Sequence, residues 1–386
     1  KVDIPLTFPH LEEELVKNCE MRIRLVIFFL LFAVFGFAND STQRQNAIVE
    51  KLVNTDHASD ADGEKKKKKK MTAVDYVPEI HGTVRAKYEY CPQLDASRFQ
   101  VRNARFSVTG NVHQMVAYKA EVELSDRGQT RILDAYVRVL PIKGLAFTLG
   151  QVKKQFSTDN LRSPHNMLFA NPAFIVSEFA NLRDVGFTAG YNAKEYVPIE
   201  VVLGVYNGNG LYDQKIWKKH FDYSARLIFN TCKYFAFDLN WQSIKPENVR
   251  MNVFDLAMRA DFYGVHLEAE GAYKIYQNSV FKPSYGFTGT AYYDIMLPKV
   301  FHHLRVLGRY DMINQNYNWK YNDQQEEYEV KSTSARQRIT AGVTLSLADP
   351  ILAELRINYE KYFHKDWSAV KADDQDKLVI EIVARF

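Results

Sequence analysis

From about residue 76 to the end of the chain, short stretches of alternating apolar and polar residues recur about sixteen times. Between residues 116 and 125, Tyr118 and Val122 fall on one set of alternate positions, and Lys119 and Glu121 fall on the other. Successive side chains of a β-strand point to opposite faces, so each such stretch predicts a strand with one apolar face and one charged face. Strands of this kind form a wall between lipid and water in transmembrane β-barrels.

The pattern predicts strands near residues 80–90, 98–109, 116–125, 131–140, 145–152, 183–191, 197–207, 221–230, 234–242, 252–262, 265–274, 284–296, 303–313, 337–347, 353–363 and 377–386. Connections after even-numbered strands are mostly brief, as at 263–264, whereas several after odd-numbered strands are long, as at 153–182 and 314–336. Short turns at one end, long loops at the other and an even strand count are typical of outer-membrane barrels. We therefore predict an all-β fold, a transmembrane antiparallel up-and-down β-barrel of about 16 strands.

The last predicted strand ends on an aromatic residue. Leu378, Ile380, Ile382 and Phe386 share one face of this strand. An alternating final strand with a terminal Phe resembles the signal that the barrel-assembly machinery of outer membranes reads. Pairing of this strand with 80–90 would close the barrel and leave no open edge in lipid.

The N-terminal region predicts export. Residues 21–38 combine a short basic start, an apolar run and small residues before a polar segment, which is the pattern of a secretory signal peptide. Residues 1–20 precede this signal and are interpreted as an upstream segment absent from the mature protein; the alternative is that they extend the signal. Residues 39–75 include the run Lys65–Lys70 and predict a disordered periplasmic tether, with contact to anionic lipid or cell wall as the alternative. The barrel itself is assigned to residues 76–386.

Composition narrows the class less than the pattern does. The chain has 25% charged residues, a formal net charge of +4 and a mean hydropathy of -0.32, because charge on one face of each strand offsets apolar residues on the other. The 25 Phe and 23 Tyr suit aromatic girdles at the two membrane interfaces. No basic module typical of nucleic-acid binding occurs. Cys91 and Cys232 are predicted at opposite barrel ends, too far apart for a disulfide.

The region from about Arg98 to Gly210 resembles one known family. The segments that carry the likeness are 101–110, 118–124, 133–137, 149–153, 183–187 and 204–210, in this order. They look like the corresponding segments of the phosphate-selective porin O and P family. The resemblance implies a sixteen-stranded outer-membrane porin, often a homo-trimer, whose third outer loop folds inward to narrow the channel. Many relatives have Phe-Lys and a proline after the Gly-Gln, where this chain has 152–156 as Val-Lys-Lys-Gln-Phe.

Charges of both signs are predicted on the interior wall. The predicted wall residues include Arg226, Arg259, Arg305, Arg309, Arg338, Arg356, Glu121, Glu123, Asp134, Glu268 and Glu270. Many of these should pair across strands, so selectivity should depend on the narrowest ring, where few charges dominate the field. The candidates for this constriction are Lys153, Lys154, Arg162 and His165 on the inward loop and Arg85, Arg105 and Arg138 on the wall. We expect a net basic constriction that favours small anions, with an unselective pore as the alternative.

Two other functional classes are an enzyme and a plugged barrel. Catalysis is not expected, because His81 and His266 have no recognisable nucleophile motif and the pair His302-His303, predicted in a turn, has no carboxylates at metal-ligand spacing. No cofactor or metal is expected. A barrel plugged by its loops, acting as a binding, assembly or surface-interaction protein, is the second functional hypothesis. The expected partners are outer-membrane lipid, small anions or other small solutes, further copies of the chain and the barrel-assembly machinery, in the outer membrane of a Gram-negative bacterium.

Overall fold

The computed structural model describes residues 76–386 apart from 127–128, 181–182, 195–196, 212–213, 216, 233, 247–248, 298–300, 323–326, 348–351 and 366–369. The predicted upstream segment, signal peptide and tether lie outside the described residues. Within the described part, no helix is long and apolar enough to cross a membrane.

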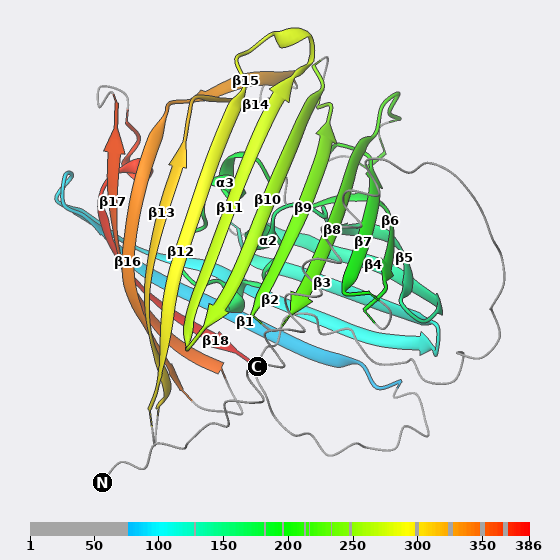
Figure 1. Cartoon of the computed structure of the whole chain (residues 1–386), viewed down its shortest axis with the longest axis horizontal. Helices are drawn as coiled ribbons and strands as arrows, with labels where there is room; N and C mark the ends of the chain where they lie inside the picture. Colours follow the sequence, from blue (N-terminus) through cyan, green and yellow to red (C-terminus); the bar gives the residue numbers. More distant parts are fainter. Residues whose placement is uncertain are drawn as a thin grey trace.

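Sixteen antiparallel strands close into one barrel (Figure 1). They are β1 (Glu79–Cys91), β2 (Ala96–His113), β3 (Val116–Asp126), β4 (Gln129–Ile142), β5 (Leu145–Lys153), β6 (Arg183–Asn192), β7 (Ile199–Tyr206), β8 (Asp222–Cys232), β9 (Phe235–Ile244), β10 (Met251–Phe262), β11 (Val265–Tyr276), β12 (Ser284–Met296), β13 (Phe301–Ile313), β16 (Arg336–Leu347), β17 (Leu352–His364) and β18 (Lys377–Arg385). Each strand pairs with its neighbours in the chain, except that β13 pairs with β16 and β1 with β18. The predicted fold class is confirmed, and most strand boundaries agree within two residues.

Three differences from the predicted elements have clear causes. The predicted loop 314–336 contains a two-stranded hairpin, β14 (Asn316–Asn322) and β15 (Glu327–Thr333). These two strands pair with each other and form a sheet separate from the barrel. β2 continues to His113, where a bulge against β3 absorbs the extra length. The prediction that His302-His303 lies in a turn was wrong: β13 begins at Phe301, because His303 pairs with Ser346 of β16.

The last strand closes the barrel on the first. In the β1–β18 register, Arg85 lies opposite Val383 and Tyr88 lies opposite Ile380. The predicted pairing of the last strand with residues 80–90 is confirmed. Past the end of β18, Gly82 and Phe386 exchange two backbone hydrogen bonds of 2.8 and 3.1 Å. The Phe386 ring covers Gly82 so closely that a Cβ there would lie 2.2 Å from the ring carbon Cζ, so a side chain at this position would displace the ring.

The polarity of the barrel is inverted relative to a soluble domain. On β18, Lys377, Glu381 and Val383 point inward and are buried, whereas Ile382 on the outside is 61% exposed. Leu149 on β5 is likewise 65% exposed. The largest fully buried side chains include several arginines, lysines and glutamates, which rarely lie inside a soluble core. The outer face therefore suits hydrocarbon and the inner face suits water and ion pairs.

Candidate functional site

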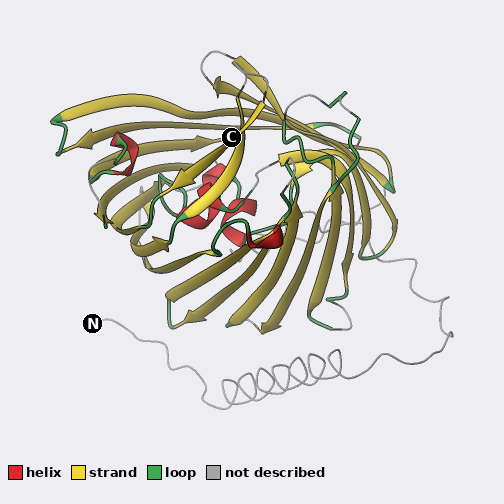
Figure 2. Ribbon diagram, turned by 90° about the horizontal axis from the view of Figure 1, so that it is seen from above, coloured by secondary structure: helices red, strands yellow, loops and turns green. Residues whose placement is uncertain are grey.

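The connection between β5 and β6 crosses the inside of the barrel. It contains α2 (Thr158–Leu161), a 3-10 turn (Pro164–Asn166) and α3 (Phe174–Glu178). Figure 2, a view from above, shows these helices within the ring of strands. Residues 154–180 are named the inner loop below. Its contacts with β11, β12, β13 and β18 show that it reaches the wall on the far side.

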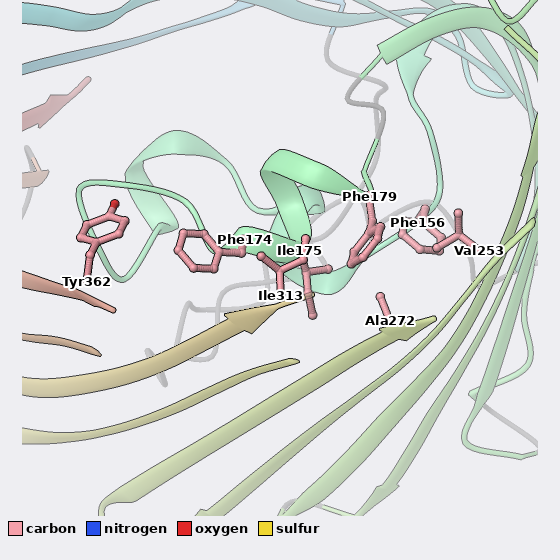
Figure 3. Packing of buried hydrophobic residues seen from close by; sticks show 8 residues of the cluster. All are labelled: Phe156, Phe174, Ile175, Phe179, Val253, Ala272, Ile313 and Tyr362. Carbon is pink, nitrogen blue, oxygen red and sulfur yellow. The ribbon is translucent and has the colours of Figure 1, made fainter. Parts of the chain in front are cut away.

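An apolar cluster attaches α3 to the wall. Phe174, Ile175 and Phe179 pack with Ile313 of β13 and Tyr362 of β17, and further members are Phe156, Val253 and Ala272 (Figure 3). All are 4% exposed or less. Burial of large apolar side chains contributes roughly 1.5–3 kcal/mol each, so this cluster fixes the inner loop against one side of the interior.

Four wall arginines hold the inner loop by its backbone. Their guanidinium groups donate to the carbonyl oxygens of loop residues: Arg85 to Ala170 at 2.8 Å, Arg356 to His165 at 2.8 Å, Arg338 to Pro172 at 2.7 Å and Arg309 to Asn171 at 3.1 Å. These four residues are named the arginine clamp. Each is also paired with a carboxylate: Glu381 for Arg85 and Arg356, Asp311 for Arg309 and Arg338, with Glu354 and Glu360 as further partners.

The carboxylates explain why such arginines can be buried. A guanidinium matches a carboxylate with two parallel donors and retains donors for a third group. Arg85 donates Nε and Nη2 to the two oxygens of Glu381, both at 3.0 Å, and uses Nη2 again for the Ala170 carbonyl. The clamp therefore holds the loop with charge that is already compensated.

The basic residues predicted on the inner loop have partners as well. Lys153, at the end of β5, donates to the carbonyl of Arg162 at 2.7 Å and caps the end of α2. Lys154 lies between Asp184 at 3.0 Å and Asp222 at 2.6 Å and is 1% exposed. Burial opposes the charge of Lys154, but these two carboxylates outweigh it and raise its pKa.

Arg162 and His165 differ in charge. Nη2 of Arg162 contacts both carboxylate oxygens of Glu268 at 2.5 Å, and Nη1 contacts Asp159 at 3.2 Å. Burial acts to lower the pKa of Arg162, but the two carboxylates raise it above its usual value. Burial and the neighbouring cations Arg385 and Arg356 lower the pKa of His165 to about 3, so this imidazole is neutral at physiological pH.

The two remaining wall candidates lie on β2 and β4, away from the clamp. Arg105 donates to Glu123 at 2.7 Å and lies 3.6 Å from Glu121. Arg138 donates to the hydroxyl of Thr148 at 3.1 Å and stacks on Tyr136. The seven constriction candidates are therefore not gathered at one place. Arg85 belongs to the clamp, the His165 carbonyl accepts from it and Arg162 meets β11, whereas Lys153 contacts the inner loop itself, Lys154 pairs with β6 and β8, and Arg105 and Arg138 lie apart on β2 and β4.

The predicted wall residues form a cross-strand charge network. Asp134 accepts from Lys119 at 2.8 Å and Arg183 at 2.7 Å, and Arg183 also contacts Glu121 at 3.1 Å. Arg226 pairs with Asp238 at 2.6 Å, and Arg305 donates to both oxygens of Asp294 at 2.6 and 2.8 Å. Glu270 accepts the backbone N–H of Asp159 at 3.4 Å. The expected pairing across strands is present at these positions.

Two cavities lie beside and below the inner loop. The smaller, with a volume of about 30 Å³, is bounded by α2, residues 167–172 and the wall at Arg259, Glu268 and Arg309. The larger, of about 410 Å³, lies at the end of the barrel with the short turns and is named the vestibule. Arg259 and Glu268 line both cavities. The cavity beside the inner loop has room for only about two or three water molecules, so the interior is narrow at that place.

The inner loop is also attached to the outer hairpin. The carboxylate of Glu178, at the end of α3, accepts from Arg336 at 2.7 Å, Asn316 at 3.0 Å and Thr333 at 3.0 Å. Burial acts to raise the pKa of Glu178, but Arg336 and these hydrogen bonds bring it below its usual value. The hairpin β14–β15 and the inner loop are therefore coupled through Glu178, whose backbone carbonyl also accepts from Asn316 and Asn318.

Among the described residues, no group of three or more His, Cys, Asp or Glu side chains is arranged to hold a metal ion. Cys91 is a free thiol at the long-loop end and is not bonded to Cys232, as predicted. His81 lies 3.5 Å from Glu79, and His266 contacts Asp261.

Comparison with known proteins agrees with the fold. Residues 79–226 match the family described as phosphate-selective porin O and P, which confirms the resemblance over that region. The chain is similar in structure to OmpT, an outer membrane protein of Vibrio cholerae, with a TM-score of 0.54, 11% identity and coverage of 80% of this chain and 98% of OmpT. Comparison with curated protein sequences gives no match.

Two further solved structures share the architecture. The outer membrane channel DcaP of Acinetobacter baumannii gives a TM-score of 0.52 at 13% identity over 80% of this chain and 97% of that one. OprB of Pseudomonas putida gives 0.53 at 8% identity over 81% and 94%. At these identities the likeness concerns the fold, and this fold is the closed sixteen-strand barrel of porins.

Proposed function

We propose that this protein is an outer-membrane porin that lets small hydrophilic solutes diffuse passively and favours small anions such as phosphate. The observation that carries the proposal is the inverted polarity of a closed barrel, with exposed apolar side chains outside and buried ion pairs inside. Such a wall is stable only with lipid on one side and water on the other. The porin family match and the porin-like neighbours support an outer-membrane channel for small solutes.

The anion preference rests on narrower support. The inner loop and clamp gather many basic residues, but most of them are compensated by carboxylates in the described interior. Selectivity then depends on the few basic groups that keep free donors near the narrow part of the path. The family description is consistent with an anion such as phosphate. A homo-trimer is part of the proposal, and one solved form of OmpT is described as a trimer.

A second function has a structural reason in its favour. The apolar cluster and the clamp fix the inner loop, and the cavity beside it holds about 30 Å³. A barrel closed in this way would serve as a binding or surface-interaction protein rather than as an open pore. Uptake of radiolabelled phosphate and of a neutral sugar into proteoliposomes separates the two functions.

The expected results are direct. Proteoliposomes with the protein should take up phosphate faster than a neutral sugar of similar size, and liposomes without it should take up neither. Equal uptake of phosphate and a small cation such as methylammonium would remove the anion preference and leave a general pore. No uptake of any solute by folded protein would favour the plugged barrel.

A further inference from the structure

The vestibule has the size and lining of a small-molecule site. Its volume of about 410 Å³ lies in the usual range of ligand pockets, roughly 300–1,000 Å³. Its wall is formed by the short-turn ends of β8 to β13, where Tyr292 and Met296, on the same face of β12 as Asp294, contribute aromatic and apolar surface. Polar groups are placed around this surface, which is the combination that fixes a small ligand in one orientation.

One arginine of this wall has no side-chain partner among the residues that the structure describes. Among the arginines that line the two cavities, Arg162, Arg305 and Arg309 contact carboxylates at 2.5 to 2.8 Å. Arg259 lines both cavities, and its guanidinium makes no hydrogen bond, ion pair or ring contact with any described residue. A guanidinium has five N–H donors in a rigid fork, and those of Arg259 are available at the junction of the cavities.

The fold explains why Arg259 is left uncompensated. In the register of β10 and β11, Arg259 lies directly opposite Glu268. Glu268 makes no ion pair with it, and both carboxylate oxygens of Glu268 instead contact Arg162 of the inner loop at 2.5 Å. On the other side, β9 places the small residue Ala236 opposite Arg259. The inner loop thus removes the one carboxylate that the sheet would otherwise give to Arg259.

The acidic residues of the vestibule are engaged elsewhere. Asp294 accepts hydrogen bonds from Nε and Nη2 of Arg305, and Asp261 contacts His266. The His266 ring stacks on Tyr292 with ring centroids 4.5 Å apart, and these aromatic groups form one wall of the vestibule. A ligand in the vestibule would therefore meet a free guanidinium beside apolar and aromatic surface.

We propose that the vestibule is a binding site for small oxyanions, phosphate or a short carboxylate, and that Arg259 is its anchor. Guanidinium binds these groups through two parallel hydrogen bonds, and Arg259 is the cavity-lining arginine with donors to offer. The site deepens the proposed function, on which it rests, because it lies directly below the narrow part of the path. It gives a passing anion a place to reside on the short-turn side.

Isothermal titration calorimetry of the purified full chain in detergent tests the site. The titrants are inorganic phosphate, succinate and, as a neutral control, glucose. The variants are Arg259→Gln, Arg259→Lys and the matched control Arg250→Gln, which removes the same charge at the long-loop end of β10. Arg250 donates to Ser243 and Phe221 there and lines neither cavity.

The expected result is binding of phosphate or succinate, or both, by the wild type and none of glucose. Arg259→Gln should weaken this binding roughly tenfold or more, since a hydrogen-bonded charged group is lost. Arg250→Gln should stay within about twofold of wild type, because a charge about 30 Å away is screened. Comparison of the two anions identifies the preferred oxyanion.

Two outcomes overturn the site: no anion binding by the folded wild type, or the same affinity in wild type and Arg259→Gln. If Arg259→Gln gives no folded barrel, Arg259→Lys replaces it, and an unchanged affinity there overturns the bidentate anchor. Calorimetry needs no open channel. A barrel that binds phosphate but transports nothing would contradict the proposed function alone, and a channel that conducts without binding would contradict this site alone.

Discussion

Removal of Arg338 tests whether the arginine clamp holds the inner loop. This guanidinium is 3% exposed, donates to Asp311 at 2.7 and 3.0 Å and to the Pro172 carbonyl at 2.7 Å, and approaches Glu360 at 3.4 Å. The change Arg338→Ala would remove a buried ion pair and one of the four arginines that donate to the loop backbone. It also removes one of two cations at the Phe174 ring, where the guanidinium carbons of Arg338 and Arg336 both lie 4.5 Å from the ring centroid.

The magnitude follows from what remains after the substitution. Breaking a buried ion pair by removing one partner costs roughly 3–5 kcal/mol. Asp311 keeps Arg309 at 2.8 Å, and Glu360 keeps Asn171 at 3.0 Å, so neither carboxylate is left alone. We therefore expect a loss near the lower end, about 3 kcal/mol in the free energy of unfolding.

Arg305→Ala is the matched control for this change. Arg305 also makes two short contacts with a carboxylate, but its side chain is 21% exposed and it donates to no carbonyl of the inner loop. Because partly exposed pairs contribute about 0–1 kcal/mol, its removal should cost about 1 kcal/mol. Urea unfolding of the refolded barrels in detergent, followed by tryptophan fluorescence, measures both losses. Equal losses in the two variants would refute the clamp.

Three further predictions concern the loop and the barrel seam. The neighbours of Glu178 hold its pKa below the usual 4.5. The stability that this carboxylate contributes is therefore present above about pH 4.5 and is lost as the pH falls below that value. In urea unfolding between about pH 5 and 3, Glu178→Gln should lose less stability than wild type. His165 has a pKa of about 3 in the folded protein against 6.5 in the unfolded chain. It should therefore lower the free energy of unfolding by up to roughly 1.4 kcal/mol per pH unit as the pH falls below 6.5. His165→Gln should abolish this contribution without altering ion selectivity at pH 7. Gly82→Ala should lower the yield of heat-modifiable barrel on gel electrophoresis, because its Cβ would meet the Phe386 ring. Gly271→Ala is the control, since no atom lies within 4 Å of its new Cβ, and it should fold at a yield closer to wild type. Equal yields would contradict the packing of Phe386 on Gly82 where the barrel closes.

The alternation of residues was sufficient to predict the barrel, because every wall strand separates lipid from a polar interior. The closing pair of strands and the division of β18 into two faces follow from that period alone. The hairpin within residues 314–336 was not predicted, because its two strands are not part of the barrel wall. The alternation of apolar and polar residues that marks wall strands therefore gave no signal for it.

The charge pairs were only partly predictable. Asp294 with Arg305 and Asp311 with Arg338 are direct cross-strand neighbours, so a correct register would have given them. The pairing of Arg162 with Glu268 joins residues 106 positions apart through the inner loop, and no strand register contains it. For the same reason Arg259 could be placed on the wall, but its lack of a partner could not be seen.

Single-channel recording of the wild-type protein in planar bilayers, with a gradient of KCl, tests the central claim most directly. A closed barrel with a polar interior narrowed by a fixed loop predicts discrete, small conductance steps and a reversal potential on the anion side. Folded, heat-modifiable protein that inserts into the bilayer and yet gives no steps would contradict the account.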